Sequence, residues 1–250
     1  QEDLSYFLHS THPHMFPFYL TEVNVNYMKL RNGELVADDF NMATHAFTLG
    51  YACHMAADQV VHGLVRELVG PYYRDKATTE RHAECEVYQD AFLFHEKFPN
   101  RQFSKTFQKE MIRIERFGFD YDGFCNLLSL AVSKAGYKRI SKQDIDGWID
   151  GIMLAFDLMD SVGPYVNAFK DLEANKDHLE EFPFYKKYYR NVNLDYTKWF
   201  DRAVEVCEAY IEEIDNLWKG HDFSYARRVT YEQNILAEDL TSPSKLRPQN

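Results

Sequence analysis

Apolar residues recur at steps of three and four along most of the chain, the spacing that places them on one face of an α-helix. This periodicity predicts helices over residues 40–69, 78–98, 103–117, 122–136 and 195–219. Ser141 and Asp144 have the spacing of a capping pair, which predicts a further helix running toward Ser161. Because no sustained two-residue alternation is present, no sheet is expected. The predicted fold class is all-α, a single multi-helix domain over 1–240 followed by a frayed tail over 241–250.

Two segments between these helices carry weaker signals. "DDFN" at 38–41 is typical of a helix N-terminus with Asp39 as its cap. Residues 175–191 are polar and aromatic, which indicates a loop with short helical pieces. Within them, "KKYYR" at 186–190 is interpreted as a cleft lining or, as is commoner, a solvated face.

One largely apolar segment, "GYACHMAADQVVHGLV" at 50–65, carries His54, Asp58 and His62 at successive steps of four residues. On a helix each such step turns the side chain by only about 40°, so the three groups form one stripe. The next predicted helix repeats this spacing with His82, Glu86 and Asp90.

A histidine and a carboxylate four residues apart on one helix can bind the same metal ion. Two such helices packed face to face would bring their imidazoles and carboxylates into one pocket. A bound cation would then offset the cost of placing these ionisable groups in an apolar interior. The donors are nitrogen and oxygen without thiolate, which suits zinc, iron or manganese in a catalytic site that keeps open positions. A single pair of this type is usually structural, but two sets on neighbouring helices favour a metal site.

At these residues the sequence resembles the zinc-dependent phospholipases C and their relatives, the single-strand-specific zinc nucleases. The bacterial branch of that family carries the block G-[YF]-x-x-H-x-x-x-D-x-x-x-H, and "GYACHMAADQVVH" at 50–62 matches every specified position. His82 and Glu86 match the His-x-x-x-Glu of the following helix. The resemblance extends over about the first 100 residues.

The family also supplies an aspartate and one more histidine upstream of this block. Asp3 corresponds to the first, and His12 is the preferred match for the second, with His9 and His14 as alternatives.

The resemblance implies an all-α fold of the zinc-dependent phospholipase C type with a site for two zinc ions. The implied ligands are Asp3, His12, His54, Asp58, His62, His82 and Glu86. Asp58 would bridge the two ions, Asp3, His12 and His54 would complete one site, and the other three ligands would hold the second ion.

The activity implied is hydrolysis of a phosphoric ester, a phosphodiester in the phospholipase C type. Two cations would polarise the phosphoryl oxygens and activate a water molecule, which Asp58 or Asp3 would orient. Arg66 and Arg81 lie near the two stripes and would contact a phosphate oxygen of the substrate, a small phosphoester or phospholipid. A third zinc, which the secreted phospholipases hold through an N-terminal tryptophan, is not expected because the chain begins with Gln1.

Two other functions are consistent with a helical metal site. One is a diverged protein of the same family that binds metal without catalysis. The other is a carboxylate-rich di-iron bundle, which is disfavoured because its Glu-x-x-His spacing is absent from the sequence.

Composition and charge limit the binding partners and the cellular location that the sequence predicts. A formal net charge of −11 argues against a broad nucleic-acid surface, and no run of 18 apolar residues predicts a transmembrane segment. The four cysteines, Cys53, Cys85, Cys125 and Cys207, form no CxxC pair and are interpreted as buried, reduced thiols. That favours a cytoplasmic location, whereas a leader removed before Gln1 would make the protein secreted. The oligomeric state has no signature in the sequence.

Overall fold

The computed structural model describes residues 4–10, 13–32, 38–70, 75–101, 120–159, 164–191 and 195–221. Within these ranges the regular structure is helical, apart from an isolated bridge between Arg190 and Asp195, so the all-α prediction is confirmed. The chain forms two compact units, unit 1 from Gln1–Gln59, Ile114–Trp148 and Ala203–Ser242, and unit 2 from Val60–Arg113, Ile149–Arg202 and Pro243–Asn250. The single domain over 1–240 stays a prediction, and the tail over 241–250 lies outside the described residues.

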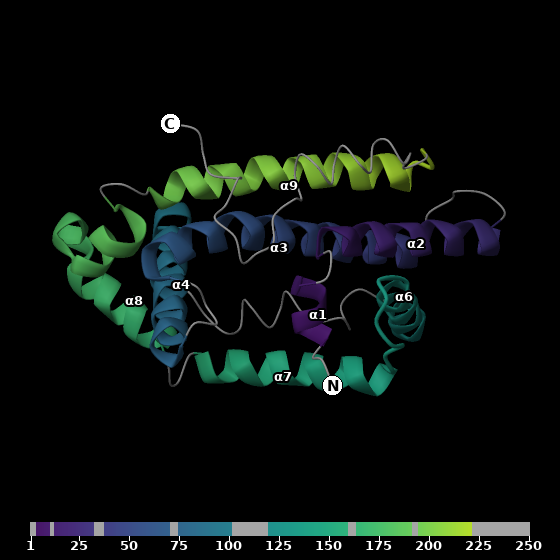
Figure 1. The fold of residues 1–250 in the computed structure, drawn as a ribbon, viewed down its shortest axis with the longest axis horizontal. Coiled ribbons are helices and arrows are strands. Elements are labelled where there is room, and N and C mark those ends of the chain that lie inside the picture. The colour runs from purple at the N-terminus through teal and green to yellow at the C-terminus, as the bar shows by residue number, and fades with distance from the viewer. Residues whose placement is uncertain are drawn as a thin grey trace. The chain divides into compact units, whose positions relative to one another are not determined.

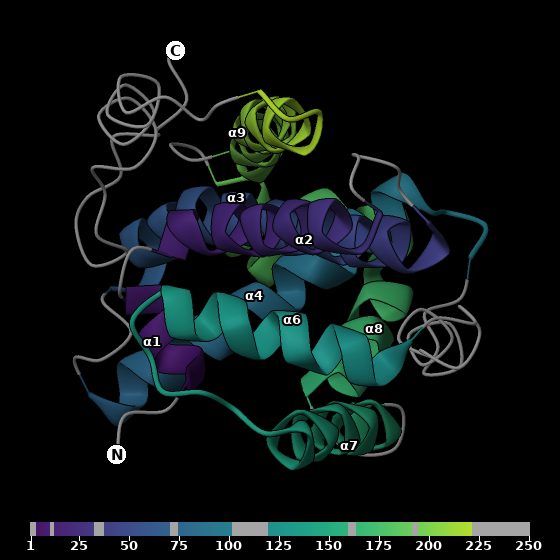
Figure 2. The ribbon, with the colours of Figure 1, turned by 90° about the vertical axis from the view of Figure 1, so that its right-hand side faces the viewer.

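Unit 1 is built from helices that are distant in sequence. It contains α1 (Leu4–Ser10), the 3-10 turn η1 (Pro13–Met15), α2 (Phe16–Asn32), α6 (Tyr121–Lys134), the first part of α3 (Asp39–Val69), the start of α7 (Lys142–Met159) and the end of α9 (Tyr196–Trp218). Helices α2 and α6 pack against each other, as Figures 1 and 2 show. The helices predicted over 40–69, 122–136 and 195–219 are confirmed within two residues at each end. The helix predicted over 103–117 lies outside the described residues.

Helix α2 has no counterpart among the predicted elements. Its sequence is rich in aromatic, β-branched and asparagine residues, which have modest helix propensity, so its helical state depends on tertiary packing. Phe16, Phe18 and Met28 are each 2 % exposed. The amide of Asn24 donates to the carbonyl of Asn41 at 3.1 Å, and the amide of Asn41 donates back to Oδ1 of Asn24 at 2.9 Å. These bonds fix α2 to the first turn of α3.

The N-terminus of α3 is capped one residue earlier than predicted. Oδ1 of Asp38 accepts a hydrogen bond from the backbone N–H of Asn41 at 2.9 Å, and the helix begins at Asp39. The prediction of Asp39 as the cap is therefore wrong. The backbone N–H of Asn41 belongs to the first turn, where it has no partner within the helix, so the carboxylate three residues before it accepts this bond, which is the geometry of an N-cap.

Within unit 1, α9 runs antiparallel to α3. The imidazole of His45 stacks on the indole of Trp218, with ring centroids 4.2 Å apart. Further along α3, Gln59 accepts a hydrogen bond at 3.0 Å from Tyr210, which comes earlier on α9. Gly220, with φ of 83°, follows the end of α9 in the left-handed conformation that glycine adopts without strain.

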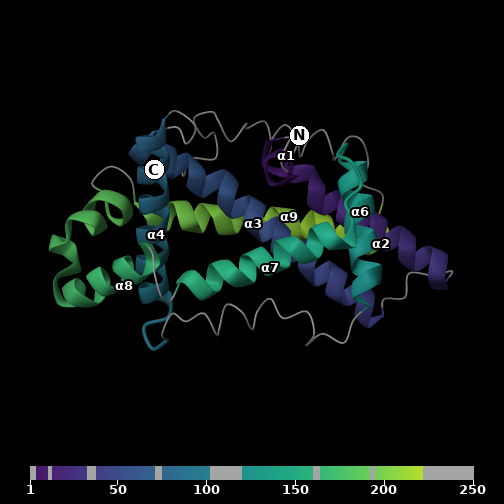
Figure 3. The ribbon, with the colours of Figure 1, turned by 90° about the horizontal axis from the view of Figure 1, so that it is seen from below.

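Unit 2 is built around an aromatic core. It contains α4 (Lys76–Lys97), α8 (Pro164–Asn175), the 3-10 helix η3 (Lys176–Glu181), the π-helical turn η4 (Tyr185–Tyr189) and the remaining parts of α3, α7 and α9. Helix α4 packs against α8 and η4, and Figure 3 shows α8 beside α4. Tyr88 of α4 stacks on Phe184 at 4.4 Å, and Phe92 meets Tyr185 edge-on at 5.0 Å. The predicted helix over 78–98 is confirmed as α4, which begins two residues earlier because Asp75 caps it.

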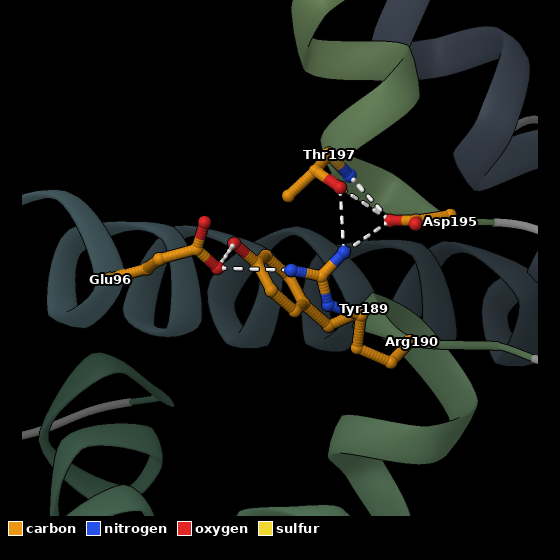
Figure 4. A network of polar contacts seen from close by, with 5 residues as sticks. All are labelled: Glu96, Tyr189, Arg190, Asp195 and Thr197. Atoms are coloured by element: carbon orange, nitrogen blue, oxygen red, sulfur yellow. Dashed lines mark hydrogen bonds and ion pairs between the residues drawn. The ribbon is translucent and has the colours of Figure 1, made fainter.

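The interpretation of 186–190 as a solvated face is wrong for its two tyrosines. Tyr188 and Tyr189 are both fully buried, whereas the two preceding lysines are exposed. The hydroxyl of Tyr189 donates to Glu96 of α4 at 2.8 Å, and Arg190 contacts the same carboxylate oxygen at 3.4 Å. Figure 4 shows Arg190 also donating to Asp195 and Thr197 at the start of α9. This network fastens η4 and the first turn of α9 to α4.

The predicted capping pair of α7 is confirmed. Oγ of Ser141 donates to Oδ2 of Asp144 at 2.7 Å, and the backbone N–H of Asp144 donates back to Oγ at 3.2 Å. Among the described helices, none combines the length and the apolar character needed to cross a bilayer.

Candidate metal centre

The polar stripe of α3 lies on the accessible side of that helix. The apolar positions beside it are fully buried: Ala52, Met55, Ala56, Val60 and Leu64. The side chains of His54, Asp58 and His62 are 50 %, 16 % and 32 % exposed. These three side chains therefore avoid most of the free-energy cost of desolvation that an apolar interior would impose. That cost applies chiefly to His82, whose side chain is 4 % exposed.

The first group of metal-compatible donors, here the His9 cluster, consists of His9, His54 and Asp58 in unit 1. Nε2 of His9 lies 3.2 Å from Nε2 of His54 and 3.3 Å from Oδ2 of Asp58. Nε2 of His54 lies 3.8 Å from the same oxygen. The imidazole of His9, which comes from α1, meets the ring of His54 edge-on, with centroids 5.4 Å apart. Two imidazole nitrogens and one carboxylate oxygen thus face one point.

These separations match the requirement of a zinc ion. Zinc binds imidazole and carboxylate at about 2.0–2.2 Å in a tetrahedral arrangement, so neighbouring ligand atoms lie about 3.4 Å apart. The three distances of 3.2–3.8 Å in the His9 cluster bracket that value. A zinc ion held by these three donors would keep a fourth position for solvent or a further ligand, as catalytic zinc sites do.

The second group, here the His82 cluster, consists of His62, His82 and Glu86 in unit 2. Nε2 of His62 and Nε2 of His82 each lie 3.0 Å from Oε1 of Glu86. The two imidazoles are perpendicular, with centroids 5.1 Å apart. In both clusters all the donor atoms lie within 4.8 Å of one another, and in both the donors are two nitrogens and one oxygen.

Glu86 is held as a carboxylate by its two histidines. Burial alone would raise its pKa, but the hydrogen bonds and charges of His62 and His82 lower that pKa to about 2. The oxygen is therefore an anionic donor at neutral pH. His62, His82 and Glu86 would together hold a metal ion through two ring nitrogens and this oxygen.

Asp90 follows His82 and Glu86 at the same four-residue spacing, but it does not join the His82 cluster. It accepts a hydrogen bond at 2.8 Å from the hydroxyl of Tyr165 on α8. Desolvation by the surrounding protein and the nearby charge of Glu86 raise the pKa of Asp90 to about 6, although the hydrogen bond from Tyr165 opposes this rise. Asp90 thus lies one turn beyond the cluster with a partner of its own.

Tyr51 supports the His9 cluster and has no signal in the ligand spacing. Its ring packs edge-on against His54 at 6.0 Å and against Phe16 at 4.9 Å. Burial and the charge of Asp58 both raise the pKa of Tyr51, so it stays a neutral phenol. The ring limits the orientations that the exposed imidazole of His54 can adopt.

The predicted substrate arginines flank the His82 cluster in sequence. Arg66 lies one turn after His62 on α3 and is half-buried. Arg81 precedes His82 and is exposed, and its guanidinium donates to Oγ1 of Thr78 at 3.0 Å.

Of the upstream candidates, the structure brings His9 to the metal-compatible donors. Asp3 and His12, the preferred sequence matches, lie outside the described residues. His14 is buried, with 6 % exposure. His9 reaches this cluster because residues 4–10 form a helix that packs near α3. No periodic pattern in the sequence predicts α1, so the sequence alone could not assign His9 to the cluster.

A family model described as zinc-dependent phospholipase C matches residues 2–134. The matched segment contains both clusters and the upstream residues Asp3 and His12. No curated protein and no solved structure matches the chain. The nitrogen and oxygen donors of both clusters fit the metal that the family description names.

Proposed function

The chain belongs to the zinc-dependent phospholipase C family, and on this premise we propose that it hydrolyses phosphoric esters with one zinc ion at the His9 cluster and one at the His82 cluster. The observation that carries this proposal is the convergence, twice, of two imidazole nitrogens and one carboxylate oxygen within 4.8 Å. Donor sets of this type leave coordination positions for water and substrate, as catalytic zinc sites do. The preferred substrate is a phosphodiester, either a small molecule or the headgroup ester of a phospholipid.

Zinc in such a site polarises phosphoryl oxygens and lowers the pKa of water toward neutrality. The protein supplies position and charge. His54 and His9 would hold imidazole nitrogens toward the metal position, and the carboxylate of Asp58, mostly shielded from solvent, would orient a water molecule toward phosphorus. At the second position Glu86 supplies a permanent negative charge.

Two finer assignments remain proposals. Asp3 would join the ligands of the ion at the His9 cluster and share the orientation of water, and His12 would be a ligand only in place of His9. Arg66 and Arg81 bind the phosphate oxygens of the substrate, for which Arg81 must exchange its bond to Thr78 for one to the ester.

The test is an assay of hydrolysis at neutral pH on three chromogenic esters: bis(para-nitrophenyl) phosphate, para-nitrophenyl phosphate and para-nitrophenyl phosphorylcholine. We expect the diesters to be cleaved faster than the monoester, with activity lost on treatment with a chelator and restored by zinc. Asp58→Asn keeps the size of the side chain but removes its charge, so the rate should fall by about 10²–10⁴-fold. Asp150→Asn, at an exposed position of α7, is the matched control and should leave the rate unchanged.

A wild-type protein that holds zinc yet cleaves none of the three esters would overturn the hydrolase proposal. That result would favour the alternative, a metal-binding protein of the family without catalysis. Asp58→Asn with the wild-type rate would remove Asp58 from the catalytic machinery.

A further inference from the structure

Two of the cysteines face each other within unit 1. Sγ of Cys207, on α9, lies 2.9 Å from Sγ of Cys53, on α3, although the two residues are 154 positions apart in sequence. A disulfide bond is about 2.05 Å long, so the sulfurs need to approach by only about 0.9 Å to bond. The interpretation of all four cysteines as buried is thus wrong for this pair: Cys53 is exposed and Cys207 is half-buried, whereas Cys85 and Cys125 are buried.

The two helices are already held together by two further contacts, which flank Cys53 on α3 and both follow Cys207 on α9. The stacking of His45 on Trp218 lies toward the start of α3, and the hydrogen bond from Tyr210 to Gln59 lies toward its other end. Both contacts fix the distance and the register between α3 and α9. The two sulfurs can therefore meet by rotation of the side chains with little movement of the backbone. Engineered disulfides often stabilise less than expected because they distort the backbone.

We propose that Cys53 and Cys207 form a reversible disulfide that fastens α9 to α3 next to the His9 cluster. The reaction is thiol–disulfide exchange with a low-molecular-weight disulfide such as oxidised glutathione. The thiolate of Cys53 attacks one glutathione sulfur, and the other glutathione leaves as a thiolate. Sγ of Cys207 then attacks Sγ of Cys53, which releases the second glutathione and gives the proton of Cys207 to solvent. Two protein thiols are oxidised, and one glutathione disulfide is reduced to two thiols.

The order of these steps follows from accessibility. The exposed Cys53 meets an incoming disulfide first. Burial and the hydrogen bond to Cys53 raise the pKa of Cys207, so Cys207 acts as the resolving sulfur once its neighbour carries glutathione. Cys53 directly precedes His54, which points about 100° away around α3, so the closed bond restrains the helix without occupying the metal position.

The bond should also stabilise unit 1, because it closes a long loop of the unfolded chain. For a loop of this length the oxidised protein should melt roughly 5–15 °C above the reduced protein. This inference does not depend on the proposed hydrolase activity.

The test is equilibration of the full chain, with a chelator present, in mixtures of reduced and oxidised glutathione, followed by acid quenching, thiol alkylation and peptide mapping. We expect the alkylated thiols to fall from four to two as the mixture becomes oxidising, with Cys53 and Cys207 joined in one peptide pair and a raised melting temperature. Cys125→Ala, a change at a buried thiol away from the pair, should fall from three thiols to one.

Two results would overturn the proposal: four alkylated thiols in the most oxidising mixture, or glutathione retained on Cys53 without transfer to Cys207. Cys53→Ser and Cys207→Ser should each abolish the joined peptide. Because the wild-type map alone distinguishes the outcomes, the test does not depend on either variant folding.

Discussion

Nε2 of His9 lies 3.3 Å from Oδ2 of Asp58, a contact that joins the short N-terminal helix α1 to the middle of α3. It makes His9 a ligand candidate where the sequence favoured His12. His9→Ala should therefore remove one zinc ion from the protein, while the metal at the His82 cluster remains. Zinc content after gel filtration measures this directly, with His178→Ala, at an exposed position on η3, as the control. If His12→Ala loses the ion and His9→Ala retains it, the assignment of His9 is wrong.

Glu86 should make the stability of the metal-free protein depend on pH. Its pKa in the folded state is about 2, below the 4.5 of the free side chain, so its contribution is complete above about pH 4.5 and is lost as the pH falls toward 2. Because the side chain is 36 % exposed, the contribution is discounted to about 1 kcal/mol.

Urea denaturation of the metal-free protein should show Glu86→Gln less stable than the wild type by that amount at pH 7. The difference should close as the pH falls from 4.5 toward 2. Glu80→Gln alters an exposed pair with Lys76 on the same helix and should show no such difference. Equal unfolding free energies of wild type and Glu86→Gln at pH 7 would contradict the prediction.

Asp90 should have the opposite effect. Its pKa is raised to about 6, chiefly by desolvation, so its contribution is present below about pH 3.8 and is lost as the pH rises through 6. Asp90→Asn keeps an acceptor for Tyr165 and removes the charge. Above pH 6 this variant should be more stable than the wild type by about 1 kcal/mol after discount for the exposed position, with no difference below pH 3.8. A variant less stable than the wild type at pH 8 would refute this account of Asp90.

The cap of α3 offers a test of the fold alone. Asp38→Ala removes the acceptor for the N–H of Asn41 and should lower the free energy of unfolding by about 1 kcal/mol. Asp39→Ala removes an exposed first-turn charge and should cost less, about 0.3–0.5 kcal/mol at low salt. Thermal or urea denaturation compares the two. If Asp39→Ala lowered the free energy of unfolding more than Asp38→Ala, Asp39 would be the cap, as the sequence predicted.

Much of the helical structure follows from local pattern. Helices α3, α6 and α9 have amphipathic periods, and α7 has a reciprocal cap, so each could be predicted without knowledge of its neighbours. Helix α2 could not, because its aromatic and β-branched residues favour a helix only once they are packed and Asn24 is paired with Asn41. The burial of Tyr188 and Tyr189 was missed for a similar reason, since a π-helical turn directs both into the aromatic core of unit 2.

Some residues of the candidate site could likewise be predicted from local sequence, whereas others depend on tertiary structure. The pairs His54 with Asp58 and His82 with Glu86 follow from a step of four residues on a helix, which sequence alone provides. The place of His9 depends on tertiary structure, because α1 is short and has no periodic signal. The step of four also suggested Asp90 as a cluster member, yet Tyr165 from a distant helix binds it instead.

Metal content by elemental analysis shows whether the two clusters each hold a zinc ion. The protein, purified without added metal and then equilibrated with zinc and freed of excess, should contain two zinc ions per chain. His54→Ala and His82→Ala should each retain one, and the double variant none. A wild-type protein with no zinc, or single variants that both keep the full complement, would contradict the account.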